Sequence, residues 1–225
     1  MGKLHNNVAL VYRKQGEYEK ALEWYEKGLA IDLKTVGPDH PSTATTYSNM
    51  ASVYDNQGEY EKALEWYEKG LAIELKTLGP EHPSTATTFI SMAVVYDNQG
   101  EYEKALEWYE KGLAIQLKTL GPDHPSTAAS YGNMASVYDD QGEYEKALEW
   151  YEKGLAIELK TLGPDHPSTA TSYNNMAVLC YNMEAYKKSL EYFETALKIR
   201  LKSLGPSHPH VTSMQQSIEV VKQKL

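Results

Sequence analysis

Histidine is the side chain that most directly suggests chemistry in this sequence, because it binds metals and transfers protons near neutral pH. His-Pro dipeptides recur every 42 residues, at His40, His82, His124, His166 and His208. A metal site needs several such side chains within coordination distance of one ion. A single histidine per repeated unit places consecutive imidazoles a whole unit apart, so we expect them to mark loops and to form no metal site.

Cys180 is the next candidate, and it is the single cysteine of the chain. It cannot form an internal disulfide, which makes a reducing compartment the expectation. Other units carry tyrosine at the same place, among them Tyr54, Tyr96 and Tyr138, so a core position is expected rather than a nucleophile. The sequence has no glycine-rich phosphate loop, zinc motif or nucleophile elbow. It therefore predicts a non-catalytic protein without a cofactor.

The charge balance argues against two classes of partner. Lys and Arg number 22 against 31 Asp and Glu, which gives a formal net charge of −9. Nucleic acids and anionic membrane surfaces both attract basic faces. The chain also lacks an apolar run of about 18 residues that could cross a bilayer, and its first residues lack the apolar stretch of a signal peptide. We expect a soluble, cytoplasmic protein that binds neither nucleic acid nor membrane.

An internal repeat organises the whole chain. Trp24, Trp66, Trp108 and Trp150 are 42 residues apart, and Tyr192 takes the next place. Such self-similarity is the signature of repeat architectures, in which stacked units bury a shared core. The 225 residues therefore divide into five units and a remainder. We expect one domain over residues 1–225, with units at about 1–41, 42–83, 84–125, 126–167 and 168–209, and a capping helix at 210–225.

Each unit predicts a first helix followed by a tight turn. In the second unit Pro41 suits the first helical turn, with His40 or Ser42 as the cap. The apolar side chains that follow share one helical face, and they are Tyr47, Met50, Ala51 and Tyr54. The tripeptide Asn56-Gln57-Gly58 then interrupts the pattern and forms the turn.

A longer second helix is expected from about Glu59 to Leu78, ended by Gly79-Pro80. Its apolar stripe consists of Tyr60, Leu64, Tyr67, Leu71, Leu75 and Leu78. A stripe this broad indicates burial on two sides. Glycines recur inside the second helices, at Gly28, Gly70, Gly112 and Gly154, with Ala196 in the fifth unit. Because glycine costs a helix about 1 kcal/mol relative to alanine, we expect a neighbouring helix to approach closely there.

These positions resemble the tetratricopeptide repeat (TPR) pattern, in which an aromatic residue, a large-small pair and Ala-x3-aromatic recur. The 42-residue length and the Leu-Gly-Pro-x-His-Pro loop are similar to the kinesin light chain type of the repeat, as are Asn6-Asn7-Val8-Ala9 and Asn174-Asn175-Met176-Ala177. The resemblance implies an all-α fold, a right-handed α-solenoid of five helix-turn-helix pairs plus a C-terminal capping helix. It further implies that the first helices line a concave groove.

Differences between units concentrate on these first helices. Residues 59–78 and 143–162 are identical, whereas three first-helix positions vary, at Ser48/Ile90/Gly132/Asn174, Asn49/Ser91/Asn133/Asn175 and Ser52/Val94/Ser136/Val178. By the resemblance, the asparagines would hold the backbone of a bound peptide, since an amide offers donors and an acceptor. The predicted groove residues are Asn7, Ser48, Asn49, Ser52, Asp55, Asn56, Ser91, Asp97, Asn98, Asn133, Asp139 and Asn175.

The predicted function is a protein–protein interaction scaffold that binds an extended peptide segment. Asp55, Asp97 and Asp139 would make the groove acidic, which favours a neutral or basic peptide with apolar side chains near Ile90 and Val94. Three alternatives stay open at this point. The varied face could be solvated without a ligand, the chain could be the repeat region of a larger multidomain protein, or it could be a consensus-like or designed array that has no native ligand.

The end of the chain predicts a lone helix that packs on the fifth pair. Its apolar residues alternate at three and four, at Val211, Met214, Ile218, Val221 and Leu225. Repeat arrays need such a polar-backed cap for solubility. The outer sides of this helix and of the first unit could also meet another chain, so end-to-end self-association is a further hypothesis.

Overall fold

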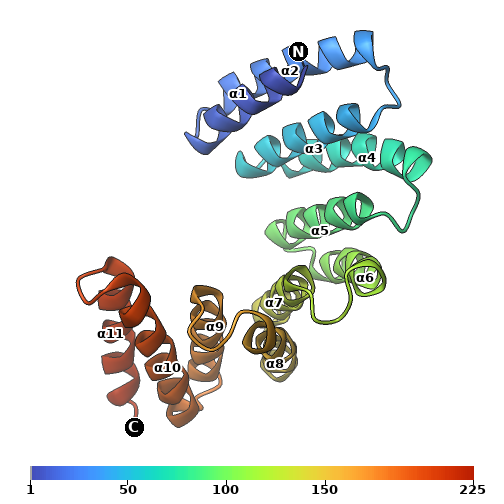
Figure 1. Ribbon diagram of the computed structural model, residues 1–225. Helices are drawn as coiled ribbons and strands as arrows, with labels where there is room; N and C mark the ends of the chain where they lie inside the picture. Colours follow the sequence, from blue (N-terminus) through green and yellow to red (C-terminus); the bar gives the residue numbers. More distant parts are fainter. Residues whose placement is uncertain (1) are drawn as a thin grey trace. The chain divides into compact units, whose positions relative to one another are not determined.

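The computed structural model describes residues 2–225 and is helical throughout that range. Eleven α-helices follow one another along these residues (Figure 1). They are α1 (Gly2–Lys14), α2 (Tyr18–Thr35), α3 (Pro41–Asn56), α4 (Tyr60–Thr77), α5 (Pro83–Asn98), α6 (Tyr102–Thr119), α7 (Pro125–Asp140), α8 (Tyr144–Thr161), α9 (Pro167–Asn182), α10 (Tyr186–Leu204) and α11 (Pro209–Lys222). The predicted all-α array of five helix-turn-helix pairs with an additional C-terminal helix is confirmed.

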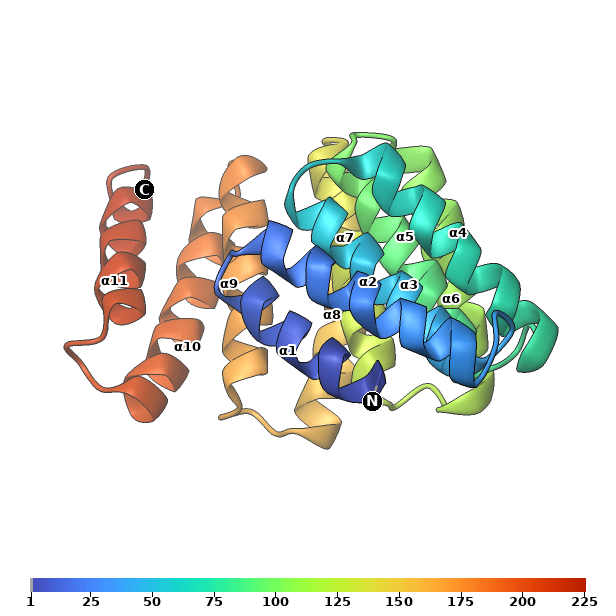
Figure 2. The ribbon, with the colours of Figure 1, turned by 90° about the horizontal axis from the view of Figure 1, so that it is seen from above.

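The helices form two compact units, one that ends at Thr119 and one that comprises Leu120–Leu225. In the first unit, α1 pairs with α2, α3 with α4 and α5 with α6, while α2 also packs on α3 and α4 on α5. In the second unit, α7 pairs with α8 and α9 with α10, while α8 packs on α9 and α10 on α11 (Figure 2). Each first helix thus packs on its own partner, and α3, α5 and α9 also pack on the preceding second helix of their unit. A single domain over residues 1–225 stays a prediction.

The periodic histidines cap helices. His40 precedes Pro41 at the start of α3, and its Nδ1 atom accepts a hydrogen bond from the backbone N–H of Ser42 at 3.1 Å. His82, His124, His166 and His208 cap α5, α7, α9 and α11 in the same way. An N-cap side chain satisfies one of the backbone donors that a helix start leaves unpaired. The prediction that the histidines mark loops is confirmed, and histidine, not Ser42, is the cap.

Glycine makes the turn inside the pairs, as Gly58 shows with a φ of 75°. In the fifth pair Glu184 occupies the same place with a φ of 58°, a conformation that disfavours residues with a Cβ atom. The second helix α4 is one residue shorter at each end than predicted. Leu75 was expected in its buried stripe but is 41% exposed, because Ile73 and Glu74 take the buried face on that turn.

The close helix approach predicted at the second-helix glycines is confirmed. A Cβ atom at Gly70 would lie 3.1 Å from Ser48 Oγ and 3.2 Å from the Ala44 carbonyl oxygen. A Cβ atom at Gly154 would lie 3.1 Å from the carbonyl oxygen of Ala128. First and second helices of a pair therefore meet almost backbone to backbone at these positions.

Methionine fills the junction between successive pairs. Met92 of α5 is fully buried and packs in one cluster with Tyr67 and Leu71 of α4. Met176 of α9 repeats this arrangement against Tyr151 and Leu155 of α8. The array therefore depends on apolar packing between pairs as well as within them.

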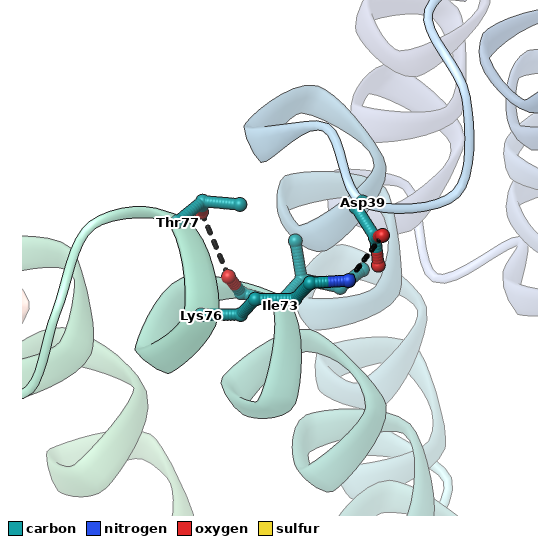
Figure 3. Close-up of polar contacts among 4 residues, drawn as sticks. All are labelled: Asp39, Ile73, Lys76 and Thr77. Atoms are coloured by element: carbon teal, nitrogen blue, oxygen red, sulfur yellow. Dashed lines mark hydrogen bonds and ion pairs between the residues drawn. The ribbon is translucent and has the colours of Figure 1, made fainter.

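Ion pairs on the surface connect the second helices α4, α6, α8 and α10 to the loop before their own pair. Lys76 Nζ lies 2.5 Å from Asp39 Oδ2, next to a helix end where Thr77 Oγ1 donates to the Ile73 carbonyl oxygen at 2.7 Å (Figure 3). Three further pairs repeat this arrangement, Lys118–Glu81, Lys160–Asp123 and Lys202–Asp165. Both partners are exposed, and such pairs contribute about 0–1 kcal/mol each. They add little to stability beside the apolar junctions.

The last helix covers the fifth pair through Val211, Met214, Ile218 and Val221, all of them buried. Leu225 was expected in this stripe, but it is 60% exposed because α11 ends at Lys222. Cys180 is buried in α9, as predicted for a core residue, and burial raises the pKa of its thiol.

A carboxyl group near the end of the second helix links successive pairs at two places, in α4 and in α8. Glu74 of α4 is buried and accepts a hydrogen bond from Thr88 Oγ1 of α5 at 2.7 Å. Glu158 of α8 accepts one from Ser172 Oγ of α9 at 2.6 Å. Burial raises the pKa of Glu74, while the Thr88 hydrogen bond and the nearby His82 act in the opposite direction.

We expect Glu74→Gln to raise the free energy of unfolding at pH 7 by about 0.5–1 kcal/mol, since an amide can accept the Thr88 hydrogen bond without burying a charge. A raised pKa means that the folded state binds the proton more tightly than the unfolded state. The wild-type protein therefore gains stability as the pH falls through the folded pKa, and the advantage of the variant shrinks. Urea unfolding between pH 7 and pH 4 measures this, with Glu68→Gln as the exposed control. An advantage that does not change with pH would contradict the assignment.

Candidate peptide-binding surface

The first helices of the first unit lie side by side, since α1 contacts α3 and α3 contacts α5. Some of the predicted groove residues form hydrogen bonds with side chains of the neighbouring first helix. The surface that α1, α3 and α5 share is called the first-helix face.

Two of the predicted asparagines border the same cavity. Asn7 of α1 and Asn49 of α3 line a space of about 640 Å³ that is closed on its third side by the C-terminal turn of α2. Asn7 is exposed and Asn49 is half-buried. Their amides can therefore reach a ligand in or above the cavity, and each offers donors and an acceptor.

The middle of the first-helix face is held by hydrogen bonds between neighbouring first helices. Arg13 Nη1 of α1 donates to Ser52 Oγ of α3 at 2.5 Å. Asn98 Nδ2 of α5 donates to Asp55 Oδ1 of α3 at 3.0 Å. Burial raises the pKa of Asp55, and the bond from Asn98 opposes this effect. Ser52, Asp55 and Asn98 thus contact other residues of the face, and a ligand would have to share them.

Tyrosines of the second helices lie beneath these side chains. Burial raises the pKa of the Tyr67 hydroxyl, and hydrogen bonds from Ser91 of α5 and Ser52 of α3 act in the opposite direction. Burial also raises the pKa of Tyr109, reinforced by the negative charges of Asp97 and Asp55. The predicted residues Ser52, Asp55, Ser91 and Asp97 therefore surround two buried hydroxyl groups that face the first helices.

Ser48 has a different environment from the other predicted residues. Its Oγ atom is buried against Gly70 within its own helix pair and has no hydrogen-bond partner. Ile90 takes the same position in the next pair, where its Cγ1 atom would lie 2.7 Å from a Cβ atom at Gly112. Variation at this position therefore reflects packing against the second helix. Asn56, in contrast, is exposed at the end of α3.

The second unit carries three predicted residues on α7 and α9. Asn133 and Asp139 lie on α7, both half-buried, and Asn175 lies on α9. Burial raises the pKa of Asp139, the negative charge of Asp140 adds to this, and a hydrogen bond from Asn182 opposes it. Burial likewise raises the pKa of Tyr151 on α8, opposed by hydrogen bonds from Ser136 and Asn175. The arrangement of the first unit recurs here.

Sequence reasoning missed two polar side chains at the cavity, Asn6 and Asp32. Each has a buried oxygen without a hydrogen-bond partner, Asn6 Oδ1 and Asp32 Oδ2. A signal for Asp32 was present. Residues 17–36 differ from residues 59–78 at two places, where Asp32 and Val36 replace Glu74 and Leu78.

Among residues 2–225, no three His, Cys, Asp or Glu side chains are grouped so that they could hold a metal ion. No helix of this described range combines the length and the apolar character that spanning a membrane requires.

The comparisons with known proteins agree with the observed architecture. The sequence profile of the tetratricopeptide repeat matches residues 1–76, 57–118, 98–159 and 155–202. A search among curated proteins yields no match.

Several solved structures have a similar fold. One is a structure from Podosopora anserina whose description names a kinesin light chain with nearly identical TPR-like repeats. It is 32% identical to this chain and aligns over 90% of this chain and 96% of its own, with a TM-score of 0.76. BtubC (BKLC) of P. vanneervenii is 24% identical over 89% of this chain and 80% of its own, with a TM-score of 0.77. The apo form of RapI is 21% identical over 90% of this chain and 71% of its own, with a TM-score of 0.75.

The repeat profile covers nearly the whole chain, and the helix pairs, capping histidines and junction residues recur with the same period. The chain belongs to the tetratricopeptide repeat family.

Proposed function

We propose that this chain is a non-catalytic interaction scaffold that binds an extended peptide segment along its first helices. Repeat arrays of this family present extended surfaces for protein partners. The observation that carries the proposal is the placement of amide, hydroxyl and carboxylate side chains from successive first helices on one face, over second helices of nearly constant sequence. Such side chains can hydrogen-bond the backbone of an extended chain, which has one donor and one acceptor per residue.

The charges of the face favour a neutral or basic partner. Asp55 and Asp97 contribute carboxylates to this face, and burial raises the pKa of Asp55. Asp139 of α7 is the equivalent carboxylate of the second unit, and burial raises its pKa too. A cationic side chain beside a partly buried carboxylate would offset the cost of that burial. Arg13 is engaged by Ser52 and contributes the opposite charge at the first pair. We therefore expect basic side chains to prefer the carboxylates of α3 and α5.

Isothermal titration calorimetry against acidic and basic peptide pools tests this proposal. We expect the basic pool to bind, and we expect Asn7→Ala with Asn49→Ala, which border one cavity, to weaken that binding about tenfold, since two hydrogen bonds to the peptide are lost. Glu68→Ala with Glu110→Ala, on the exposed sides of second helices, serves as the matched control. A preference for the acidic pool would contradict the partner class, and undiminished binding by the asparagine variant would contradict the surface.

The same titration also tests two alternatives. In one, the chain is the repeat region of a larger multidomain protein, and in the other it is an array that has no native ligand. An array without a ligand would bind neither pool specifically. A repeat region of a larger protein would bind as proposed, while partner domains would hold any activity. The nearly identical repeats are compatible with either alternative.

Self-association is a second candidate, supported by apolar exposure on α1. Leu4 is 61% and Val11 54% exposed, whereas Thr46 and Val53 are buried at the equivalent positions of α3. In α3 these positions face the preceding second helix, α2. We expect light scattering over a concentration series to show reversible dimers that Leu4→Gln with Val11→Gln abolishes. A monomer at all concentrations would contradict this candidate.

A further inference from the structure

A carboxylate with one unpaired oxygen lies at the cavity between α1, α2 and α3. Asp32, near the end of α2, is 7% exposed and lines this space. Its Oδ2 atom is buried and makes no hydrogen bond with any described residue. Burying a charged oxygen without a partner is costly, and proteins normally pair such groups or hydrogen-bond them.

Comparison with the other pairs shows which hydrogen bond Asp32 lacks. Glu74 and Glu158 occupy the equivalent positions, and each accepts a hydrogen bond from a hydroxyl of the following first helix. Asp32 is one methylene shorter. The equivalent hydroxyl, Thr46 Oγ1, donates to the Ser42 carbonyl oxygen at 3.1 Å and accepts from Asn6 Nδ2 at 2.7 Å.

The Asp32 carboxylate points back toward α1. A Cβ atom at Gly2 would lie 2.0 Å from Asp32 Oδ1. Four later first helices carry alanine at the position of Gly2, at Ala44, Ala86, Ala128 and Ala170. Glycine in α1 thus provides the space that the carboxylate occupies.

Asn6, one turn beyond Gly2 in α1, also borders the cavity. Its Oδ1 atom is buried against α2, where a Cβ atom at Gly28 would lie 2.6 Å away, so it packs on the second helix as Ser48 and Ile90 do. The bond from Asn6 Nδ2 to Thr46 determines the orientation of this amide. The unpaired oxygen at the cavity is therefore Asp32 Oδ2, and it matches a ligand group that carries N–H donors and a positive charge.

The rest of the cavity fits the aliphatic part of such a ligand. Leu10, Ile31 and Val36 supply apolar wall, and the space measures about 640 Å³. Lys3 lies on the same wall, is exposed and would repel a cation. Asp32 and Val36 are also the two positions at which residues 17–36 depart from residues 59–78, so both departures fall on the cavity.

We propose that this cavity is a subsite for a lysine or arginine side chain of the bound peptide, with Asp32 as its counter-ion. The proposal rests on the peptide-binding function proposed above and specifies one side chain of the partner. The aliphatic stem lies against the apolar wall, and the cationic head lies at the end of α2.

The test uses small probes, so that it does not depend on finding the natural peptide. Nα-acetyl-lysine methylamide and its arginine and norleucine counterparts are titrated into the ¹⁵N-labelled chain and followed by NMR. We expect saturable shifts in α1, in the C-terminal turn of α2 and at the Asn6 side-chain amide for the two cationic probes. Norleucine, which keeps the stem and lacks the charge, should leave these signals unchanged.

Three variants make the test specific. Asp32→Asn, which is nearly isosteric, should weaken binding of the lysine probe about tenfold or more. Asp32→Glu with Val36→Leu makes residues 17–36 identical to 59–78, and it should also lose binding because glutamate can reach Thr46 and leucine fills the cavity. Lys3→Gln should strengthen binding. Glu158→Gln, at the equivalent position of α8, is the matched control and should bind as the wild type does.

The absence of saturable shifts in the wild type would overturn the proposal, as would equal affinity in Asp32→Asn, retained affinity in the double variant or equal shifts with norleucine. These outcomes are distinct from failure of the proposed function. If peptides bind in the calorimetric test while Asp32→Asn leaves binding of the lysine probe unchanged, the proposed scaffold function is supported and the proposed subsite is contradicted. If binding of the probe depends on Asp32 while neither peptide pool binds, the proposed peptide-binding function is contradicted and the cation subsite is supported.

Discussion

Replacing Met92 with alanine is expected to lower the free energy of unfolding by about 2–5 kcal/mol. Met92 is fully buried in α5 and packs in one cluster with Tyr67 and Leu71 of α4. Truncation removes apolar contacts and leaves a cavity that α4 and α5 cannot close without shifting a helix. The substitution weakens the junction between two pairs. The stability of a repeat array depends on such contacts between nearest neighbours.

Urea unfolding followed by circular dichroism measures this loss. Val94→Ala, two residues along the same helix and half-buried, is the control and should change stability by less than about 1 kcal/mol. Met176→Ala, at the equivalent junction of α8 and α9, should cause a loss of similar size. A loss below about 1 kcal/mol for Met92→Ala would show that the junctions contribute little and that each pair is stable by itself.

The fold could be predicted in detail because each local signal is repeated. The His-Pro steps, the turn glycines and the Ala-x3-aromatic spacing recur every 42 residues. The helix boundaries predicted for one unit are therefore supported by the same signals in the others. The errors are local and have local causes. Leu75 has the right spacing for burial, but Ile73 and Glu74 take the buried face. Leu225 continues an apolar period beyond the point at which α11 ends.

The candidate surface was predictable only in part, because the partners of its side chains come from other units. Ser52 is bonded by Arg13 and Asp55 by Asn98, pairs that are 39 and 43 residues apart in the sequence. Sequence comparison shows which positions vary, but not whether the variation faces a ligand or a neighbouring helix. At Ser48 and Ile90 it faces the second helix. At Asp32 the loss of one methylene removes a bond that glutamate makes elsewhere.

Replacing Ile218 with glutamate is expected to detach α11 from the rest of its unit. Ile218 is 5% exposed and packs in one cluster with Phe193, Ala196, Met214 and Val221. An ionised carboxylate in this cluster would lose its hydration without gaining a partner, which costs several kcal/mol in addition to the lost apolar contacts, about 3 kcal/mol or more in total. Undocking the single helix avoids that cost, because no later helix of residues 2–225 holds α11 in place.

Hydrogen exchange measured by mass spectrometry should therefore show α11 losing most of its protection, α10 losing part of it, and α8 unchanged. Val220→Glu, two residues along and 49% exposed, places the same charge on the outer face and should leave α11 docked. Undocking also uncovers Phe193, which stands where α8 carries the buried Tyr151. An uncovered second-helix face of this kind is the surface on which a first helix normally packs, so Ile218→Glu should associate more strongly in light scattering than Val220→Glu. Equal protection of α11 in the two variants would mean that its docking depends on Val211 and Met214 rather than on the centre of the stripe.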